Sequence, residues 1–202
     1  VASRTVTVQP PQRDNDRGGG GGGDPLAQSF MIDVEDGVFI TSVDTFFKTK
    51  SSTIPVRAEI RVMINGYPGT TILPFAQKYL NPSEVNISDD GATATTFTFD
   101  SPVYLQEGTE YCLVLYSDSS DYQTYVARLG DVQINSDRTV SKQPNMGVLF
   151  KSANNRTWSA EQMEDLKFTL NKAVFSTTTG TVTLTNKELP TRTLDNNSIR
   201  TF

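Results

Sequence analysis

The chain has 202 residues, a formal net charge of −5 and no histidine. A nucleic-acid partner is disfavoured, because neutralising phosphates needs clustered cations and the chain has no Lys/Arg run. The lack of histidine excludes Ser-His-Asp and Cys-His nucleophile systems and removes the commonest zinc and iron ligand. The only cysteine, Cys112, lies in an apolar run, so we expect a buried thiol, and no intrachain disulfide is possible.

No apolar stretch approaches the roughly 18 to 20 residues that a membrane span needs, and no secretory pattern opens the chain. We therefore expect neither a membrane nor a nucleic acid among the partners. The chain begins at Val1 rather than Met, which predicts a processed product or a piece of a longer polypeptide.

The N-terminal region reads as a tether. Six consecutive glycines occupy residues 18–23, after a polar, Pro-containing stretch. Glycine loses the most backbone entropy on ordering, so residues 1–24 are expected to form a flexible arm or linker. A nucleotide-binding loop would need a strand before the glycines, a helix after them and a Gly-Lys-Ser/Thr ending, and the sequence has none of these.

The next elements in chain order are strands. Residues 29–34 and 38–49 flank Glu35-Asp36-Gly37, which predicts a short hairpin. Residues 54–65 then alternate apolar and polar side chains, with Ile60 at the middle of the apolar set. A period of two predicts one face in the core and the other, with Glu59 and Arg61, in water. Asn65-Gly66-Tyr67-Pro68-Gly69 is expected to break this strand, and residues 70–75 to resume it.

Further strand-like segments follow at turn-separated intervals: residues 93–100, 110–117, 122–129, 148–151 and 166–174. One short helix is expected at residues 159–165, because Ser159 can cap it and Gln162 lies three residues on. The predicted fold is all-β, an antiparallel β-sandwich over residues 25–175. Residues 176–202 lose the dense alternation and are expected to form an extended C-terminal connector.

Four aromatic residues could form a sugar-stacking platform, because aromatic faces bind pyranose rings. They are Tyr67, Tyr122, Tyr125 and Trp158. The alternative is core and turn packing, which we favour because tyrosine in strands is usually half-buried.

Carboxylates suggest two further kinds of site, neither of which we favour. Two groups, Asp33 with Glu35 and Asp36 and the pair Asp118 and Asp121, could bind calcium, but neither has the spacing of a dedicated loop. A glycosidase pair could come from five residues: Glu107, Glu110, Glu161, Glu164 and Asp165. Such a pair must face across a cleft, and nothing in the sequence sets two of them opposite each other. We therefore expect that the chain is not an enzyme and that it requires no cofactor, metal or small molecule.

Several short motifs together resemble a module of baseplate wedge proteins from contractile-tailed bacteriophages, especially myoviruses of cyanobacteria. The match spans residues 24–175, about three quarters of the chain. Its motifs are Asp24-Pro25-Leu26-Ala27-Gln28-Ser29-Phe30, Phe39-Ile40-Thr41-Ser42-Val43-Asp44, Phe46-Phe47-Lys48-Thr49-Lys50, Asn65-Gly66-Tyr67-Pro68, Ser101-Pro102-Val103-Tyr104-Leu105, Glu110-Tyr111, Gly147-Val148-Leu149-Phe150-Lys151-Ser152 and Glu164-Asp165-Leu166-Lys167-Phe168.

The resemblance implies a jelly-roll sandwich similar to carbohydrate-binding modules, with an architectural role and no catalytic residues. It implies other baseplate or tail proteins as partners in a symmetric multi-subunit assembly, located in the virion and assembled in the host cytoplasm. Thr181-Val182-Thr183-Leu184-Thr185-Asn186 and Leu189-Pro190 resemble the strand that leads into the next domain. The chain is then either an excised segment or a short stand-alone version. A glycan- or receptor-binding module of a phage tail or fibre is the alternative function.

Overall fold

The structure, a computed structural model, describes residues 5–8, 25–134, 136–142, 147–152, 154–177 and 179–184. Its described residues form strands and one short 3-10 helix, Pro82–Glu84. The strands are β1 (Thr5–Val8), β2 (Leu26–Met31), β3 (Val38–Thr45), β4 (Phe47–Thr49), β5 (Val56–Ile64), β6 (Tyr67–Leu80), β7 (Thr95–Leu105), β8 (Glu110–Ser117), β9 (Tyr122–Arg128), β10 (Leu149–Ser152), β11 (Trp158–Glu161), β12 (Glu164–Leu166) and β13 (Phe168–Lys172).

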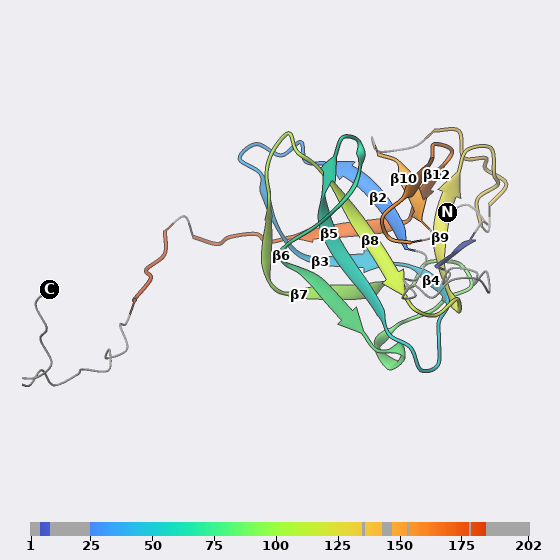
Figure 1. Cartoon of the computed structure of the whole chain (residues 1–202), viewed down its shortest axis with the longest axis horizontal. Coiled ribbons are helices and arrows are strands. Elements are labelled where there is room, and N and C mark those ends of the chain that lie inside the picture. Colours follow the sequence, from blue (N-terminus) through green and yellow to red (C-terminus); the bar gives the residue numbers. More distant parts are fainter. Residues whose placement is uncertain are drawn as a thin grey trace, which may run out of the picture.

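The strands form antiparallel sheets in two layers (Figure 1). The large sheet has the order β11-β10-β2-β8-β5-β6, and the sheet β13-β3-β7 lies across it. A further sheet is built around β9, which pairs with β1, β4 and β12. Since β4 continues β3 and β13 continues β12, this sheet extends the second layer. An antiparallel, all-β architecture of the sandwich kind is therefore confirmed.

The main core lies between these layers. Ile60 of β5 has no exposed surface, as predicted from its place in the alternation, and Val43, Phe97, Leu113 and Leu115 are equally buried. β6 and β7 lie side by side and close one margin of the two layers. The opposite margin, between β2 and β13, is the open one.

Glu59 and Arg61, on the opposite face of β5, are not in water, so the expectation was wrong for these two residues. Glu59 has no exposed surface and Arg61 is 3% exposed. The side chains form an ion pair in which Arg61 Nη2 lies 2.6 Å from Glu59 Oε2. Asn155, in the connection between β10 and β11, accepts a hydrogen bond from Arg61 Nη1 at 3.0 Å. A second apolar cluster shares this face: Ala27, Cys112, Val114, Phe150 and Trp158.

Two turns differ from their sequence prediction. Asn65 and Gly66 have φ values of +51° and +78°, which suit a two-residue hairpin loop, so β6 resumes at Tyr67 and continues to Leu80. Pro68 lies within β6, an edge strand, where its missing N–H costs no ladder bond. The Asp36-Gly37 turn does not form a hairpin. It passes the chain from β2 in the large sheet to β3 in the second layer.

The short helix expected at residues 159–165 is wrong. Ser159 and Ala160 pair with β10, and Asp165 pairs with Ala127 of β9, so two strands meet at a turn over Gln162 and Met163. A single helical turn is only marginally stable by itself. Pairing with β10 and β9 instead gives these residues backbone hydrogen bonds to neighbouring strands.

The chain termini carry the other differences from expectation. Residues 5–8, inside the expected flexible arm, form β1 and pair with Tyr122 to Tyr125 of β9. The rest of residues 1–24 lies outside the described residues. The last predicted strand, residues 166–174, is divided into β12 and β13 and ends at Lys172. The connector expected over residues 176–202 is described as far as Leu184, and the remainder lies outside the described part.

Candidate functional site: an open cleft and an exposed segment

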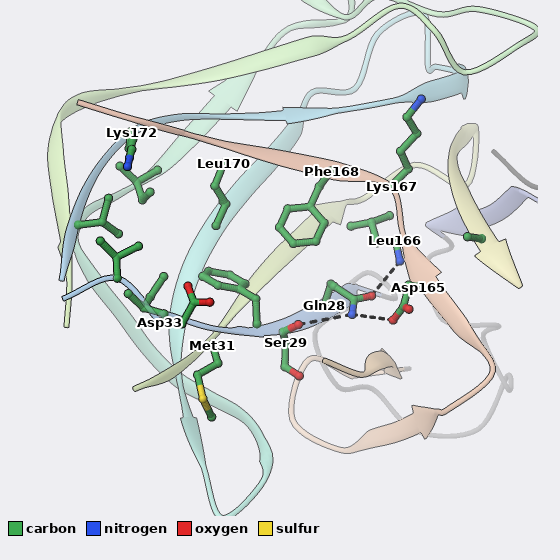
Figure 2. A pocket seen from close by; sticks show the side chains of 16 residues that line it. Gln28, Ser29, Met31, Asp33, Asp165, Leu166, Lys167, Phe168, Leu170 and Lys172 are labelled. Atoms are coloured by element: carbon green, nitrogen blue, oxygen red, sulfur yellow. Dashed lines mark hydrogen bonds between the residues drawn. The ribbon is translucent and has the colours of Figure 1, made fainter. Parts of the chain in front are cut away.

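A cleft of about 750 Å³ opens between β2 and β13 (Figure 2). It forms because β10 pairs with β2 only over Leu26 to Gln28, whereas β2 continues to Met31. From Phe30 onward, the side of β2 that faces β13 lacks a strand partner in the part of the chain that the structure describes. The two layers therefore diverge here without a strand between them.

The cleft wall is mostly apolar. Phe30 of β2 faces Phe168 of β13 with ring centroids 5.9 Å apart, and both pack on the main core. The other apolar lining residues are Met31, Ile32, Val34, Val38, Ile40, Ala127, Leu166 and Leu170. Phe168 and Leu170 are only partly buried, so the cleft leaves apolar surface of β13 in contact with solvent.

One end of the cleft is polar. The Gln28 amide donates to Asp165 Oδ1 at 3.0 Å and accepts from the Leu166 backbone N–H at 2.8 Å, which ties β2 to β12 (Figure 2). Asp165 Oδ2 is buried without a hydrogen-bond partner. Burial raises the pKa of Asp165, and the hydrogen bond from Gln28 only partly opposes this. The polar end of the cleft therefore contains a buried carboxyl group with only one of its two oxygens hydrogen-bonded.

The neighbouring cation does not neutralise this carboxylate. Lys167 Nζ donates to the Gly91 carbonyl at 2.7 Å and lies 4.1 Å from the Phe46 ring centroid. Figure 2 shows its side chain directed away from Asp165. Burial lowers the pKa of Lys167.

β13 forms one border of the cleft and is an edge strand. It pairs with β3 on one side, from Phe168 with Thr45 to Lys172 with Ile40. Its other side has no strand partner among the described residues. An edge of this kind presents unpaired backbone groups to an incoming strand.

The chain leaves the sandwich directly after β13. Residues 173–177 and 179–184, called the exposed segment below, run extended and away from the two layers (Figure 1). The Ala173 N–H donates to the Phe39 carbonyl at 2.8 Å, and the Phe175 ring packs edge-on against Phe39 at 5.5 Å. Beyond this contact, Val182 is 81% exposed and Leu184 is 90% exposed. Neither of these two side chains belongs to the core of the sandwich.

The four aromatic residues considered for a sugar platform do not share an exposed surface. Tyr122 and Tyr125 are buried, and their hydroxyls donate at 2.6 Å to the carbonyls of Ile54 and Ser88. Trp158 is buried in the second apolar cluster. Tyr67 is 53% exposed, with its ring 5.9 Å from that of Phe150. Only Tyr67 therefore presents a substantial ring face.

Three of the five calcium candidates, Asp36, Asp118 and Asp121, form hydrogen bonds within or between turns. The Asp36 N–H donates to Glu107, and the carboxylates of Asp118 and Asp121 accept from Tyr116 and Ser119. Among the described residues, no group of three or more His, Cys, Asp or Glu side chains is placed to hold a metal ion.

Two of the carboxylates considered for acid/base chemistry, Glu161 and Glu164, contact the same ammonium group. Glu164 is buried and accepts from Lys151 Nζ at 2.9 Å, and Glu161 lies 3.7 Å from the same ammonium. Asp165 is held by Gln28 in the cleft. Burial raises the pKa of the Cys112 thiol to about 12, so it stays protonated at neutral pH.

Sequence reasoning missed the cleft and its polar end. Gln28 and Asp165 are far apart in the chain, and no periodicity connects them. The one available signal was a run of three apolar residues at positions 30–32. Such a run is unusual in a strand with one side facing solvent, where apolar and polar residues normally alternate.

Comparisons with protein-family models, curated proteins and solved structures found no match. Within the described residues, no helix has the length and apolarity needed to cross a membrane.

Proposed function

We propose that this chain is a structural protein of a tailed-phage virion, a baseplate or tail component that holds neighbouring subunits through its terminal segments. Its sandwich, which we take to be of jelly-roll type, provides the rigid body. The sequence motifs that resemble wedge-protein modules support this proposal, as does the all-β architecture. Assembly is the mechanism, and it requires no reacting group.

The exposed segment is the observation that carries the proposal. It extends away from the sandwich and holds Val182 and Leu184 in water, although neither residue contributes to this fold. Burying a valine or leucine side chain contributes about 1.5–3 kcal/mol, so these side chains represent binding energy that a neighbouring subunit can use. A segment that orders on contact suits stepwise addition of subunits.

Deletion of residues 176–202 tests the proposal. The truncated chain is expected to keep its thermal unfolding transition, because Phe175 is retained and the deleted described residues contribute nothing to the core. It should fail to enter the assembled particle. Hydrogen exchange should show rapid exchange at residues 176–184 in the free chain and protection in the particle. Normal incorporation of the truncated chain would contradict the assembly function.

Glycan binding is the second candidate, and it has less support. Of the four aromatic residues proposed for it, only Tyr67 offers a substantial ring face. Saturable binding of host-surface polysaccharide that Tyr67→Ala abolishes would favour this candidate over assembly.

A further inference from the structure

The exposed segment and the free edge of β13 are complementary. We propose that residues 181–184 of one copy add as a strand to β13 of a second copy, with Val182 and Leu184 entering the cleft. This inference rests on the proposed assembly function and names both the partner and its binding site. Every chain therefore has both a donor segment, residues 181–184, and an acceptor strand, β13.

The side-chain pattern of the donor matches that of the acceptor. On β13, Phe168 and Leu170 face the cleft, whereas Thr169 and Asn171 alternate with them. Residues 181–184 read Thr-Val-Thr-Leu, which is the same two-residue alternation. Strand addition in register places Val182 and Leu184 in the cleft. A slip of one residue would leave both in water, so the cleft itself selects the register.

The outward side chains match as well. The outer surface of the sheet β13-β3-β7 is rich in threonine, with Thr96, Thr98 and Thr169 exposed and Thr41 partly so. An added strand would place Thr181 and Thr183 in line with this surface. Cross-strand threonine pairs are favourable neighbours on a sheet.

Electrostatics do not oppose the addition. The exposed segment carries no charged residue, so it brings no unpaired charge into the apolar cleft. Natural edge strands are commonly protected by charged side chains, yet Phe168 and Leu170 of β13 face the cleft, and the charged Lys172 lines it only at the end of the strand.

The chain's own path favours a second copy over its own cleft. Ala173 bonds to Phe39 of β3, and Phe175 packs on the same residue. β3 lies on the side of β13 opposite the free edge, so these contacts direct the chain away from its own cleft. Reaching that cleft would require a reversal of the chain and the loss of both contacts.

Self-association of the full chain provides the first test. Sedimentation at chain concentrations up to about 1 mM covers weak contacts of the strength that a short strand can form. The wild-type chain is expected to associate reversibly. Val182→Ser with Leu184→Ser should weaken association at least about a hundredfold, since two apolar side chains lose their burial. Thr181→Ser with Thr183→Ser is the matched control and should change it less than about threefold.

Cross-linking between chains locates the contact. A chain carrying Thr183→Cys is mixed with a longer, tagged chain carrying Thr169→Cys, and the mixture is oxidised. We expect a disulfide-linked pair of unequal chains, because adjacent strands bring such positions within bonding range. The control replaces Thr169→Cys by Thr98→Cys on β7, a position that is also exposed but does not line the cleft. Cys112 is buried and should not compete.

Three outcomes would overturn the inference: a chain that stays monomeric at the highest concentration, equal weakening by both serine pairs, or a cross-link between unequal chains that forms no more readily with Thr169→Cys than with Thr98→Cys. If the chain is monomeric but truncation at residue 175 still prevents particle entry, the assembly function stands and the partner is a different protein. If the truncated chain enters the particle normally, the assembly function itself fails.

Discussion

Replacing Glu59 by Gln removes one charge from the buried ion pair of β5 while keeping the volume of the side chain. In the wild-type chain, Glu59 Oε2 accepts from Arg61 Nε at 2.7 Å, and Gln77 donates to Oε1 at 2.9 Å. Arg57 Nε also lies 2.8 Å from Oε1, as an ion pair outside hydrogen-bond geometry. The substitution leaves the Arg61 guanidinium, 3% exposed, without its anion.

Removing one partner of a buried ion pair costs about 3–5 kcal/mol, because the remaining charge stays desolvated. For a folded unit of this size, each kcal/mol lowers Tm by about 2–4 °C, so Glu59→Gln should lower Tm by roughly 6–20 °C. Urea unfolding should show a lower midpoint with an unchanged slope.

The matched control is Asp100→Asn, which breaks the exposed pair between Lys78 and Asp100. Exposed pairs contribute about 0–1 kcal/mol, so Tm should change by a few degrees at most. Combining Glu59→Gln with Arg61→Met removes both charges and should recover part of the loss. The reasoning is refuted if Glu59→Gln destabilises no more than Asp100→Asn.

Three further predictions concern the core, the cleft and the thiol. Ile60→Ala should lower the free energy of unfolding by about 2–5 kcal/mol, and Ile60→Asp should prevent folding; a wild-type melting temperature for either would contradict its buried position. Burial raises the pKa of Asp165 in the folded chain. The protonated carboxyl therefore stabilises the fold at low pH, and this stabilisation is lost as the pH rises through the pKa of the folded state. Asp165→Asn should therefore gain in Tm over wild type as pH increases from about 4 to 7, whereas an unchanged difference would refute the assignment. Cys112, with a pKa of about 12, should not react with a thiol reagent at pH 8 unless the chain is unfolded; labelling of the native chain would show the burial to be wrong.

The sequence predicted the parts of the fold that follow from local periodicity. Alternation in residues 54–65 correctly placed Ile60 in the core. The same alternation misplaced Glu59 and Arg61, because a period of two separates the faces of a strand but does not reveal a second layer of contacts. Asn155 and Gln77, which bond to this pair, come from distant positions that no local pattern connects.

The cleft could not be predicted from local periodicity, because it follows from the order of the strands in the sheets. The cleft exists because β10 stops pairing with β2 after Gln28 and because β13 ends a sheet, and both facts are properties of strand order. Sequence did indicate the β-prone character of residues 181–184. It did not indicate that a free edge of matching pattern lies on the same chain.

The direction in which the chain leaves β13 determines how the protein would respond to a mechanical load. The exposed segment continues roughly along the line of β13, so tension on it pulls that strand lengthwise past β3 (Figure 1). The backbone bonds between the five residues of β13 and their partners on β3 would then be loaded together rather than opened one after another from an end. A sandwich connected to its neighbours in this way can transmit force between subunits without its outermost strand peeling away.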